Sequence, residues 1–396
     1  MLSMILTNGS THPIGLDISD LSIKLVQLDK RRDKITIQAL NKLNLPQGII
    51  VNGEIKNKTE LIKAIRKIIS DPLYGKVSSE EVVVCLPESK TFIKLIEIQK
   101  SPNPLADIIG SEIEKHVPMA INEIYCDWQI IEELTDKYLI LIGAAPKDIV
   151  NQYTEMLDEA KLSPIALEIE PIAICRCLLK EETSNLKPIT SKIKNKIDVN
   201  LNYGIIDIGA NHTCMIFYSG NTILFTVSVP ISGEEITAKI SRALNLTKEQ
   251  AEKAKIICGL DENKANGIIK DILADTLKNL VEKIKEAISF YENYFQQYGP
   301  LDRILLCGGG ANIPDLEKII SREFSIKVKL ANALVNLSEQ KNKFDEIFME
   351  EHTLNLKSAK LNSGDKRENL SVKQNSNATF TTAFGLALRG IFIDEL

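Results

Sequence analysis

Two short stretches of the sequence share one order of residue types, and both could form a binding site for phosphate groups. Residues 14–28 (IGLDISDLSIKLVQL) and 204–218 (GIIDIGANHTCMIFY) each contain an apolar segment ending in an aspartate, a polar turn and a second apolar segment. This pattern predicts a β-hairpin, and backbone N–H groups in such a turn can hold phosphate oxygens. Asp17 and Asp207 are 190 positions apart in a chain of 396 residues, so we expect two related halves.

The two turns differ in what they present to a bound phosphate. Gly209 has no Cβ that would keep a phosphate away, whereas the first turn has Ser19 at that place and offers a hydroxyl group. Lys24 could place an ammonium group on the phosphates. The other hairpin residues that we expect at the phosphates are Ser22, Ala210, Asn211 and Thr213.

Asp17 and Asp207 cannot bind phosphate directly, because carboxylate and phosphate are both anionic. Two carboxylates beside one polyphosphate indicate a cation between them, and Mg²⁺ held mainly through water suits that arrangement. The alternative is that each aspartate only starts a type I turn, a common place for this residue. The repetition of the hairpin at half-chain separation favours the magnesium site.

A strand followed by three glycines comes late in the second half. Residues 303–307 read as the strand, and Gly308, Gly309, Gly310 and Ala311 follow it. Glycine lets the backbone pass close to a flat ring, and the N-terminus of the next helix favours a negative group nearby. Three glycines are weak evidence by themselves, so they support a nucleotide site only together with the hairpins.

Hydrophobic periodicity divides the rest of the chain into parts. Helices are predicted at 59–69, 105–115, 147–161, 271–297, 314–322 and 378–388, and strands at 82–86, 92–98 and 138–144. We expect a first core at 13–81 and 164–180, an inserted α+β subdomain at 82–163, a linker at 181–202, a second core at 203–231 and 301–337, a helical subdomain at 232–300, a flexible insertion at 338–377, and a C-terminal helix at 378–396 that returns to the first core.

Composition argues against several other classes of protein. The chain has 48 basic and 53 acidic residues, a formal charge of −5, so no strong field would gather nucleic acid or anionic lipid. No run of about 18 apolar residues predicts a membrane span, and the first residues lack the pattern of a secretory signal. We therefore expect a cytoplasmic protein without direct membrane insertion. The seven cysteines, several within apolar segments, predict reduced core residues.

The order of these parts resembles the actin-like ATPase superfamily over most of residues 13–390. Within it, the sequence is similar to the PilM family of type IV pilus assembly. The similarity lies in seven collinear segments: DISDLSIKLVQL (17–28), EIEKHVPMAINEIYCDWQ (112–129), AAPKDIVNQYTEMLDEAKLSP (144–164), DIGANHTCMIF (207–217), SGEEITAKISRALNLTKEQAEKAK (232–255), GGGANIPDLEKII (308–320) and ATFTTAFGLALRG (378–390). The resemblance implies an α/β actin-like ATPase fold of two duplicated ribonuclease-H-like domains, with the inserted α+β subdomain that PilM shares with FtsA.

The resemblance also implies ATP and Mg²⁺ as cofactors, bound between the two halves, and roles for further residues. Glu170 opens the segment EPIA, a form often seen in the superfamily's connecting helix, and would orient the attacking water or the metal shell. Gly233, Glu252 and Lys255 would lie at the nucleotide, the last two at its ribose and adenine. The alternatives are a glutamate in the first turn of a helix, beside a permitted proline, and a solvent-facing ion pair.

The partner that the resemblance implies is the short cytoplasmic N-terminal peptide of PilN, an inner-membrane protein, bound between the first core and the inserted subdomain. The chain would then lie at the inner face of the cytoplasmic membrane through its partner, near other platform and motor proteins of the pilus, with self-association left open. Hydrolysis of ATP, if any, would be slow.

Two other functions remain as alternatives. An FtsA-like filament anchor of cell division would need a C-terminal amphipathic helix, and residues 389–396 are short and acidic. A sugar kinase of the superfamily would need sugar-binding polar loops where this chain has the inserted subdomain.

Overall fold

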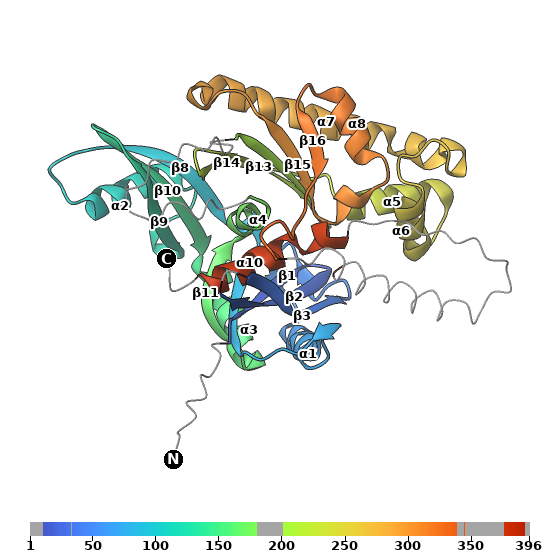
Figure 1. Ribbon diagram of the computed structural model, residues 1–396, viewed down its shortest axis with the longest axis horizontal. Helices are drawn as coiled ribbons and strands as arrows, with labels where there is room; N and C mark the ends of the chain where they lie inside the picture. Colours follow the sequence, from blue (N-terminus) through green and yellow to red (C-terminus); the bar gives the residue numbers. More distant parts are fainter. Residues whose placement is uncertain (1–10, 33, 180–200, 339–343, 345–375, 393–396) are drawn as a thin grey trace, which may run out of the picture.

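Two mixed β-sheets, one in each half of the chain, form the centre of the fold, and a smaller third sheet lies beside them (Figure 1). The structure is a computed structural model that describes residues 11–32, 34–179, 201–338, 344 and 376–392. Most of the expected linker at 181–202 and of the expected insertion at 338–377 therefore lies outside the described residues. Among the described helices, none combines the length and the hydropathy of a membrane span.

The first half is built on a six-stranded sheet that contains the first hairpin. In sheet order its strands are β11 (Ser163–Ile169), β7 (Glu81–Leu86), β1 (Ile14–Ser19), β2 (Ser22–Arg31), β3 (Lys34–Asn44) and β6 (Tyr74–Gly75). β1 and β2 are antiparallel, with Asp17 opposite Lys24, whereas β7 runs parallel to β1. The predicted hairpin is present, and its apolar residues, such as Leu16 and Leu25, are fully buried.

Helices cover both faces of this sheet. One apolar cluster joins it to α1 (Lys58–Ser70) and α3 (Lys147–Ala160), while α4 (Glu170–Leu178) and α10 (Thr381–Ile391) pack in other clusters with strand residues such as Val26 and Val83. A short hairpin of β4 (Ile50–Val51) and β5 (Glu54–Ile55) lies between β3 and α1 in the sequence. The backbone N–H groups of its turn, at Asn52 and Gly53, donate to the carboxylate of Asp20.

The second half repeats the core of the first. Its five-stranded sheet has the order β14 (Thr222–Val229), β13 (Thr213–Ser219), β12 (Tyr203–Ile208), β15 (Arg303–Cys307) and β16 (Lys327–Leu330). The hairpin β12–β13 is antiparallel and β15 runs parallel to β12, as β7 runs parallel to β1. The expectation of two related halves is confirmed by this repeated arrangement.

Helices also cover the second sheet. They are α5 (Gly233–Leu244), α6 (Lys248–Ile257), α7 (Ile268–Tyr294) and α8 (Leu316–Glu323). The predicted apolar stripe of α7 is buried at Leu273, Leu280 and Ile284, in one cluster with Ile206 and Ile304 of the sheet. Burial of this stripe stabilises a helix whose other faces carry charged residues and face solvent.

The third sheet belongs to the inserted part of the first half. Its strands have the order β8 (Phe92–Gln99), β10 (Lys137–Pro146) and β9 (Ile124–Glu133), and α2 (Leu105–His116) packs on one face through Ile109 and Ile113. The expected boundary at residue 82 is wrong, because β7 lies inside the first sheet between β1 and β11. The physical reason is that β7 is buried on both faces, which an apolar run alone cannot assign to one sheet or another.

Helix α10, red in Figure 1, inserts between β1 and α4 through very small residues. A Cβ on Gly385 would overlap the backbone of Ala173 in α4, and a Cβ on Gly15 of β1 would overlap the backbone of Ala383 and Ala387. Backbone atoms cannot move aside as side chains can, so glycine is required at both positions. The last helix of the chain thereby completes the interior of the first half.

Two described residues differ from the expected linker and insertion. Asn202 is 5% exposed, and its amide nitrogen donates to the carbonyl oxygens of Tyr298 and Pro300 at 2.7 and 2.8 Å, so the linker does not extend to it. Phe344 is fully buried, with ring centroids 5.8 Å from Phe380 and 6.0 Å from Phe384. At this position the chain forms part of the core, which the mostly polar composition of 338–377 did not predict.

Candidate nucleotide-binding site

Asp17 and Lys24 face each other across the first hairpin and form an ion pair. Lys24 Nζ lies 2.7 Å from Asp17 Oδ2, and the two side chains are 12% and 6% exposed. Burial alone would lower the pKa of Lys24, but the charges of Asp17, Glu170 and Asp207 outweigh it and raise that pKa. Lys24 therefore stays protonated and keeps its positive charge near the carboxyl groups of Asp17, Glu170 and Asp207.

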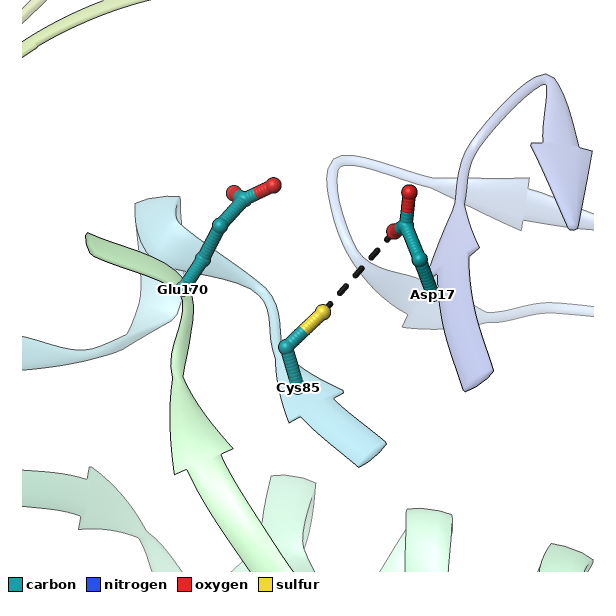
Figure 2. A group of neighbouring side chains, drawn as sticks. All are labelled: Asp17, Cys85 and Glu170. Atoms are coloured by element: carbon teal, nitrogen blue, oxygen red, sulfur yellow. Dashed lines mark hydrogen bonds between the residues drawn. The ribbon is translucent and has the colours of Figure 1, made fainter. Parts of the chain in front are cut away.

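Three side chains that could ligate a metal ion converge beside this pair (Figure 2). They are Asp17 of β1, Cys85 near the end of β7 and Glu170 at the start of α4, and one ligand atom from each lies within 4.8 Å of the others. The Cys85 thiol donates to Asp17 Oδ1 over 3.8 Å, and burial raises its pKa, so it remains a donor. Thr382 of α10 donates to Glu170 Oε1 at 3.1 Å and fixes that carboxyl group.

Asp207 has equivalent surroundings in the second half. The Cys307 thiol, from the parallel strand β15, donates to Asp207 Oδ1 over 3.7 Å, as Cys85 of β7 donates to Asp17. Burial is the largest effect on Asp207 and raises its pKa to about 6. Each half thus repeats an aspartate with a thiol donor beside it.

Glu170 holds its proton unusually tightly for a carboxyl group. Burial, together with the charges of Asp207 and Asp17, raises its pKa to about 8. A divalent cation would offset the repulsion among these carboxylates, and oxygen donors around an ion that keeps several waters suit Mg²⁺. Among the described residues, the oxygen donors Asp17 and Glu170 fit a magnesium ion, whereas Asp207 lies outside this group of ligand atoms and acts on Glu170 through its charge.

The second turn, residues 209–212, is shaped by backbone hydrogen bonds. Gly209 N–H donates to the carbonyl oxygen of His212 at 2.9 Å, and Gly233 N–H donates to that of Gly209 at 3.0 Å. A Cβ on Gly209 would come within 2.9 Å of the His212 oxygen, so this tight turn needs glycine. Ala210 accepts from Glu234 N–H at 3.0 Å, which joins the turn to the start of α5.

The hydroxyl groups of the two hairpins make hydrogen bonds within the protein. Ser19 Oγ donates to the Ser22 carbonyl oxygen at 3.0 Å, and both serines lie partly exposed at the first turn. Thr213 is fully buried and donates to the Ile231 carbonyl oxygen at 2.6 Å. In this structure Thr213 ties β13 to the segment before α5, whereas the serines lie where a ligand could reach them.

The three glycines after β15 have different surroundings, and these exclude a larger residue at two of the three positions. Gly308 has a φ of +79°, and a Cβ there would overlap Asp207 Oδ1, while a Cβ on Gly310 would overlap the side chain of Ile208. Gly309 is exposed with open space around it, and Ala311 is 2% exposed. Gly308 and Gly310 therefore let the segment pack on the second hairpin, and Gly309 has the backbone that a ligand could approach.

Glu252 and Lys255 of α6 form an ion pair of 2.6 Å, but the lysine does not face solvent. Lys255 is 7% exposed, and its Nζ donates to the Gly233 carbonyl oxygen at 3.1 Å and to Thr237 Oγ1 at 2.9 Å. The pair therefore joins α6 to the start of α5, next to the second turn. A solvent-facing ion pair is excluded for Lys255.

Sequence reasoning missed four residues of this site: Cys85, Cys307, Glu88 and His212. His212 Nε2 lies 3.1 Å from Glu88 Oε2, and hydrogen bonding to Glu88 is the largest effect that raises the pKa of His212 to about 9. The two cysteines lie at or near the ends of apolar strands and look like core residues in sequence. Only the parallel pairing of β1 with β7 and of β12 with β15 brings them to the aspartates.

Comparisons with known proteins agree with this architecture. A family model described as type IV pilus assembly protein PilM matches residues 15–361. Among solved structures, a PilM-PilN type IV pilus biogenesis complex is similar at a TM-score of 0.72 and 20% identity, covering 96% of this chain and 98% of that one. The ethanolamine utilization protein EutJ from Carboxydothermus hydrogenoformans is similar at a TM-score of 0.52 and 14% identity, covering 96% and 90%.

Sequence relatives lie in a neighbouring family. The cell division protein FtsA of Bacillus subtilis is 22% identical over 363 residues, which are 82% of this chain and 79% of that protein. FtsA of Enterococcus hirae is 22% identical over 364 residues, 80% of this chain and 77% of that protein. The fold is that of the actin-like ATPases. Because the family model spans well over half of its length, this chain belongs to the PilM family of type IV pilus assembly proteins.

Proposed function

We propose that this chain is a nucleotide-binding scaffold of type IV pilus assembly, which takes MgATP between its two halves and binds the N-terminal cytoplasmic peptide of a PilN-like inner-membrane protein. The observation that carries the nucleotide part is the pair of aspartate-bearing hairpins, whose carboxyl groups, with Glu170, act on one another and on Lys24. Membership in the PilM family supports the place in pilus assembly.

Different residues would hold the magnesium ion and the phosphate groups of MgATP. Asp17, Asp207 and Glu170 would hold the water shell of the magnesium ion, which neutralises phosphate charge. Lys24 would contact the phosphates, and the second turn would present backbone N–H groups to them. Glu170 can accept a proton from water only after a cation has lowered its raised pKa, so we expect hydrolysis to be slow and to depend on magnesium.

Asp207→Ala is expected to weaken MgATP binding at least about tenfold, because a charge-assisted hydrogen bond to the metal's water shell is worth about 1.5–3 kcal/mol. Isothermal titration with and without Mg²⁺ measures this. Asp275→Ala, a change at an exposed aspartate of α7, is the matched control and should leave the affinity unchanged. Equal affinities of Asp207→Ala and wild type would reduce Asp207 to a turn residue.

The peptide part of the proposal concerns the edge of the third sheet. The strands predicted at 82–86, 92–98 and 138–144, where we expect an edge for the peptide, correspond to β7, β8 and β10. β7 and β10 each have neighbours on both sides, and β8 is one edge of the third sheet. β8 contacts β14 of the second half, and the other edge is β9, which exposes Tyr125, Trp128 and Ile130 by 49%, 38% and 40%. Tyr125 Oη lies 3.4 Å from Asn151 Oδ1 of α3, so β9 adjoins the first core, and an extended peptide could pair with it there.

Trp128→Ala is expected to weaken binding of a PilN-type N-terminal peptide at least about tenfold, since exposed aromatic residues often carry most of the binding free energy. Fluorescence anisotropy with the labelled peptide, with and without MgATP, measures the affinity. Tyr294→Ala removes an aromatic side chain that is 69% exposed on α7, and it should bind the peptide as wild type does. Equal losses in both variants would contradict the assignment to β9.

The sequence similarity to FtsA supports a second candidate function for this chain, that of a nucleotide-dependent filament protein. Sedimentation with MgATP separates the two. Filaments together with no peptide binding would favour the FtsA-like function.

A further inference from the structure

Two side-chain pairs connect the second turn, residues 209–212, to the first half of the chain. Asn211 Nδ2 donates to Asp20 Oδ2 at 2.5 Å, and His212 Nε2 lies 3.1 Å from Glu88 Oε2. Both first-half partners come from loops, Asp20 between β1 and β2 and Glu88 just after β7. The turn expected to hold phosphate is therefore also one of the places where the two halves touch, besides contacts such as that of Asn336 with the carbonyl oxygen of Arg176 in α4.

The pair of Glu88 and His212 is partly shielded from water. The Glu88 side chain is 10% exposed and that of His212 is 31% exposed. Glu88 Oε1 also accepts a weak hydrogen bond from the Cys214 thiol of β13 over 3.8 Å, so both oxygens of this carboxylate meet the second half. A carboxylate this buried is costly without a partner, so the contact favours one relative position of the halves.

Glu88 lies at the start of the chain segment that enters the third sheet. It begins a short 3-10 helix, Glu88–Lys90, and β8 follows at Phe92. Lys90 Nζ pairs with Glu54 Oε1 at 2.6 Å, which ties this segment to the β4–β5 hairpin. A movement of Glu88 would therefore be carried into β8.

The second pair, Asn211 with Asp20, is also connected to the β4–β5 hairpin. Asp20 accepts the backbone N–H groups of Asn52 and Gly53 at 2.6 and 2.9 Å, besides the amide of Asn211. A Cβ on Gly53 would overlap Pro87, the residue before Glu88. Asn211 and His212 thus hold two sides of one connected unit, made of the β4–β5 turn and residues 87–90.

We propose that Glu88 and His212 are positioning residues that hold the second turn against the first half, and that through them the nucleotide controls the order of the segment leading into the third sheet. This inference rests on the proposed nucleotide binding and names its regulation. It concerns no bond-making step.

The nucleotide would act on the equilibrium between two arrangements of the halves, one separated and one closed. When the halves separate, water solvates His212 and Glu88 and the pair is lost; when they close on a ligand, the pair forms again. A ligand can shift this equilibrium only by binding the closed state more tightly, which a turn that both donates to phosphate and carries His212 allows. By thermodynamic linkage, loss of the pair must lower nucleotide affinity by the same factor by which it weakens closure.

Hydrogen–deuterium exchange of the full chain, with and without saturating Mg²⁺ and ATP, tests this. In the wild type we expect nucleotide to slow exchange about tenfold in both hairpins, 14–28 and 204–218, and in residues 88–99. In His212→Gln and in Glu88→Gln the hairpins should still be protected at saturation, while the protection of 88–99 should be lost. His12→Gln, at a partly buried histidine before β1 that lies outside the pair and outside the segments followed, is the matched control and should behave as wild type.

The outcomes separate this inference from the proposed function. Protection of 88–99 that persists in both variants overturns the role of the pair while nucleotide binding stands. Absence of protection in the wild-type hairpins overturns nucleotide binding and the inference with it. If His212→Gln no longer binds nucleotide, Glu88→Gln decides, because Glu88 is not expected to contact the phosphates.

Discussion

Glu168→Gln should lower the free energy of unfolding by about 3–5 kcal/mol, the usual cost of removing one member of a buried ion pair. The Glu168 side chain is 2% exposed, and its two oxygens accept from Arg176 at 2.6 and 2.7 Å and from Arg389 at 2.8 Å. The variant leaves two guanidinium groups without their anion. Because Arg176 lies on α4 and Arg389 on α10, we expect both helices to loosen from β11.

Urea unfolding followed by circular dichroism measures this loss. The matched control is Glu159→Gln on α3, whose side chain is 57% exposed and pairs with Lys58 at 2.6 Å. Exposed pairs contribute about 1 kcal/mol or less, so the control should unfold close to wild type. Similar midpoints for the two variants would mean that the cluster at Glu168 contributes nothing beyond an exposed pair.

Phe344→Ala should also destabilise the fold, by about 3–5 kcal/mol, because truncating a buried aromatic side chain leaves a cavity. Phe344 is fully buried against Phe380 and Phe384, the residues that lead into α10 and form its first turns. Thermal unfolding with and without the substitution measures the effect. Phe290→Ala removes a phenylalanine that is 43% exposed and should cost clearly less.

A small effect of Phe344→Ala would show that its segment is as dispensable as its polar composition suggests. A large effect would mean that any shortening of residues 338–377 must spare Phe344. The two results call for different truncated proteins in later work.

How far the sequence predicts this protein depends on how local each signal is. The hairpins at Asp17 and Asp207 are local patterns, and both are present. Strand β9 is missing from the expected elements although its sequence does alternate, with apolar residues at every second position: Ile124, Cys126, Trp128 and Ile130. This local signal was overlooked. Phe344 lies in a segment that is polar overall, but Ile347 and Phe348 follow it at the i+3 and i+4 spacing of an amphipathic helix, a signal that the composition of 338–377 outweighed.

In the site, too, the sequence predicts contacts between nearby residues but not contacts between distant segments. Asp17 and Lys24 are seven residues apart and opposite each other in one hairpin, so their pairing follows from the turn. Glu88 and His212 lie in different halves, and their contact depends on how the two sheets are placed. The thiol donors Cys85 and Cys307 depend on parallel pairing, for which a single sequence carries no register signal.

The position of α10 has a consequence for how the protein folds while it is being made. Gly385 and Gly15 bring the last helix into direct backbone contact with α4 and β1, although the whole second half separates them in the chain. Domains generally fold in the order in which they leave the ribosome. Here the first half emerges with its interior incomplete, while the second half, residues 201–338, already carries its own sheet and helices. The first half therefore needs residues 381–391 to complete its interior, so we expect a chain whose synthesis stops before them to fold its second half more completely than its first.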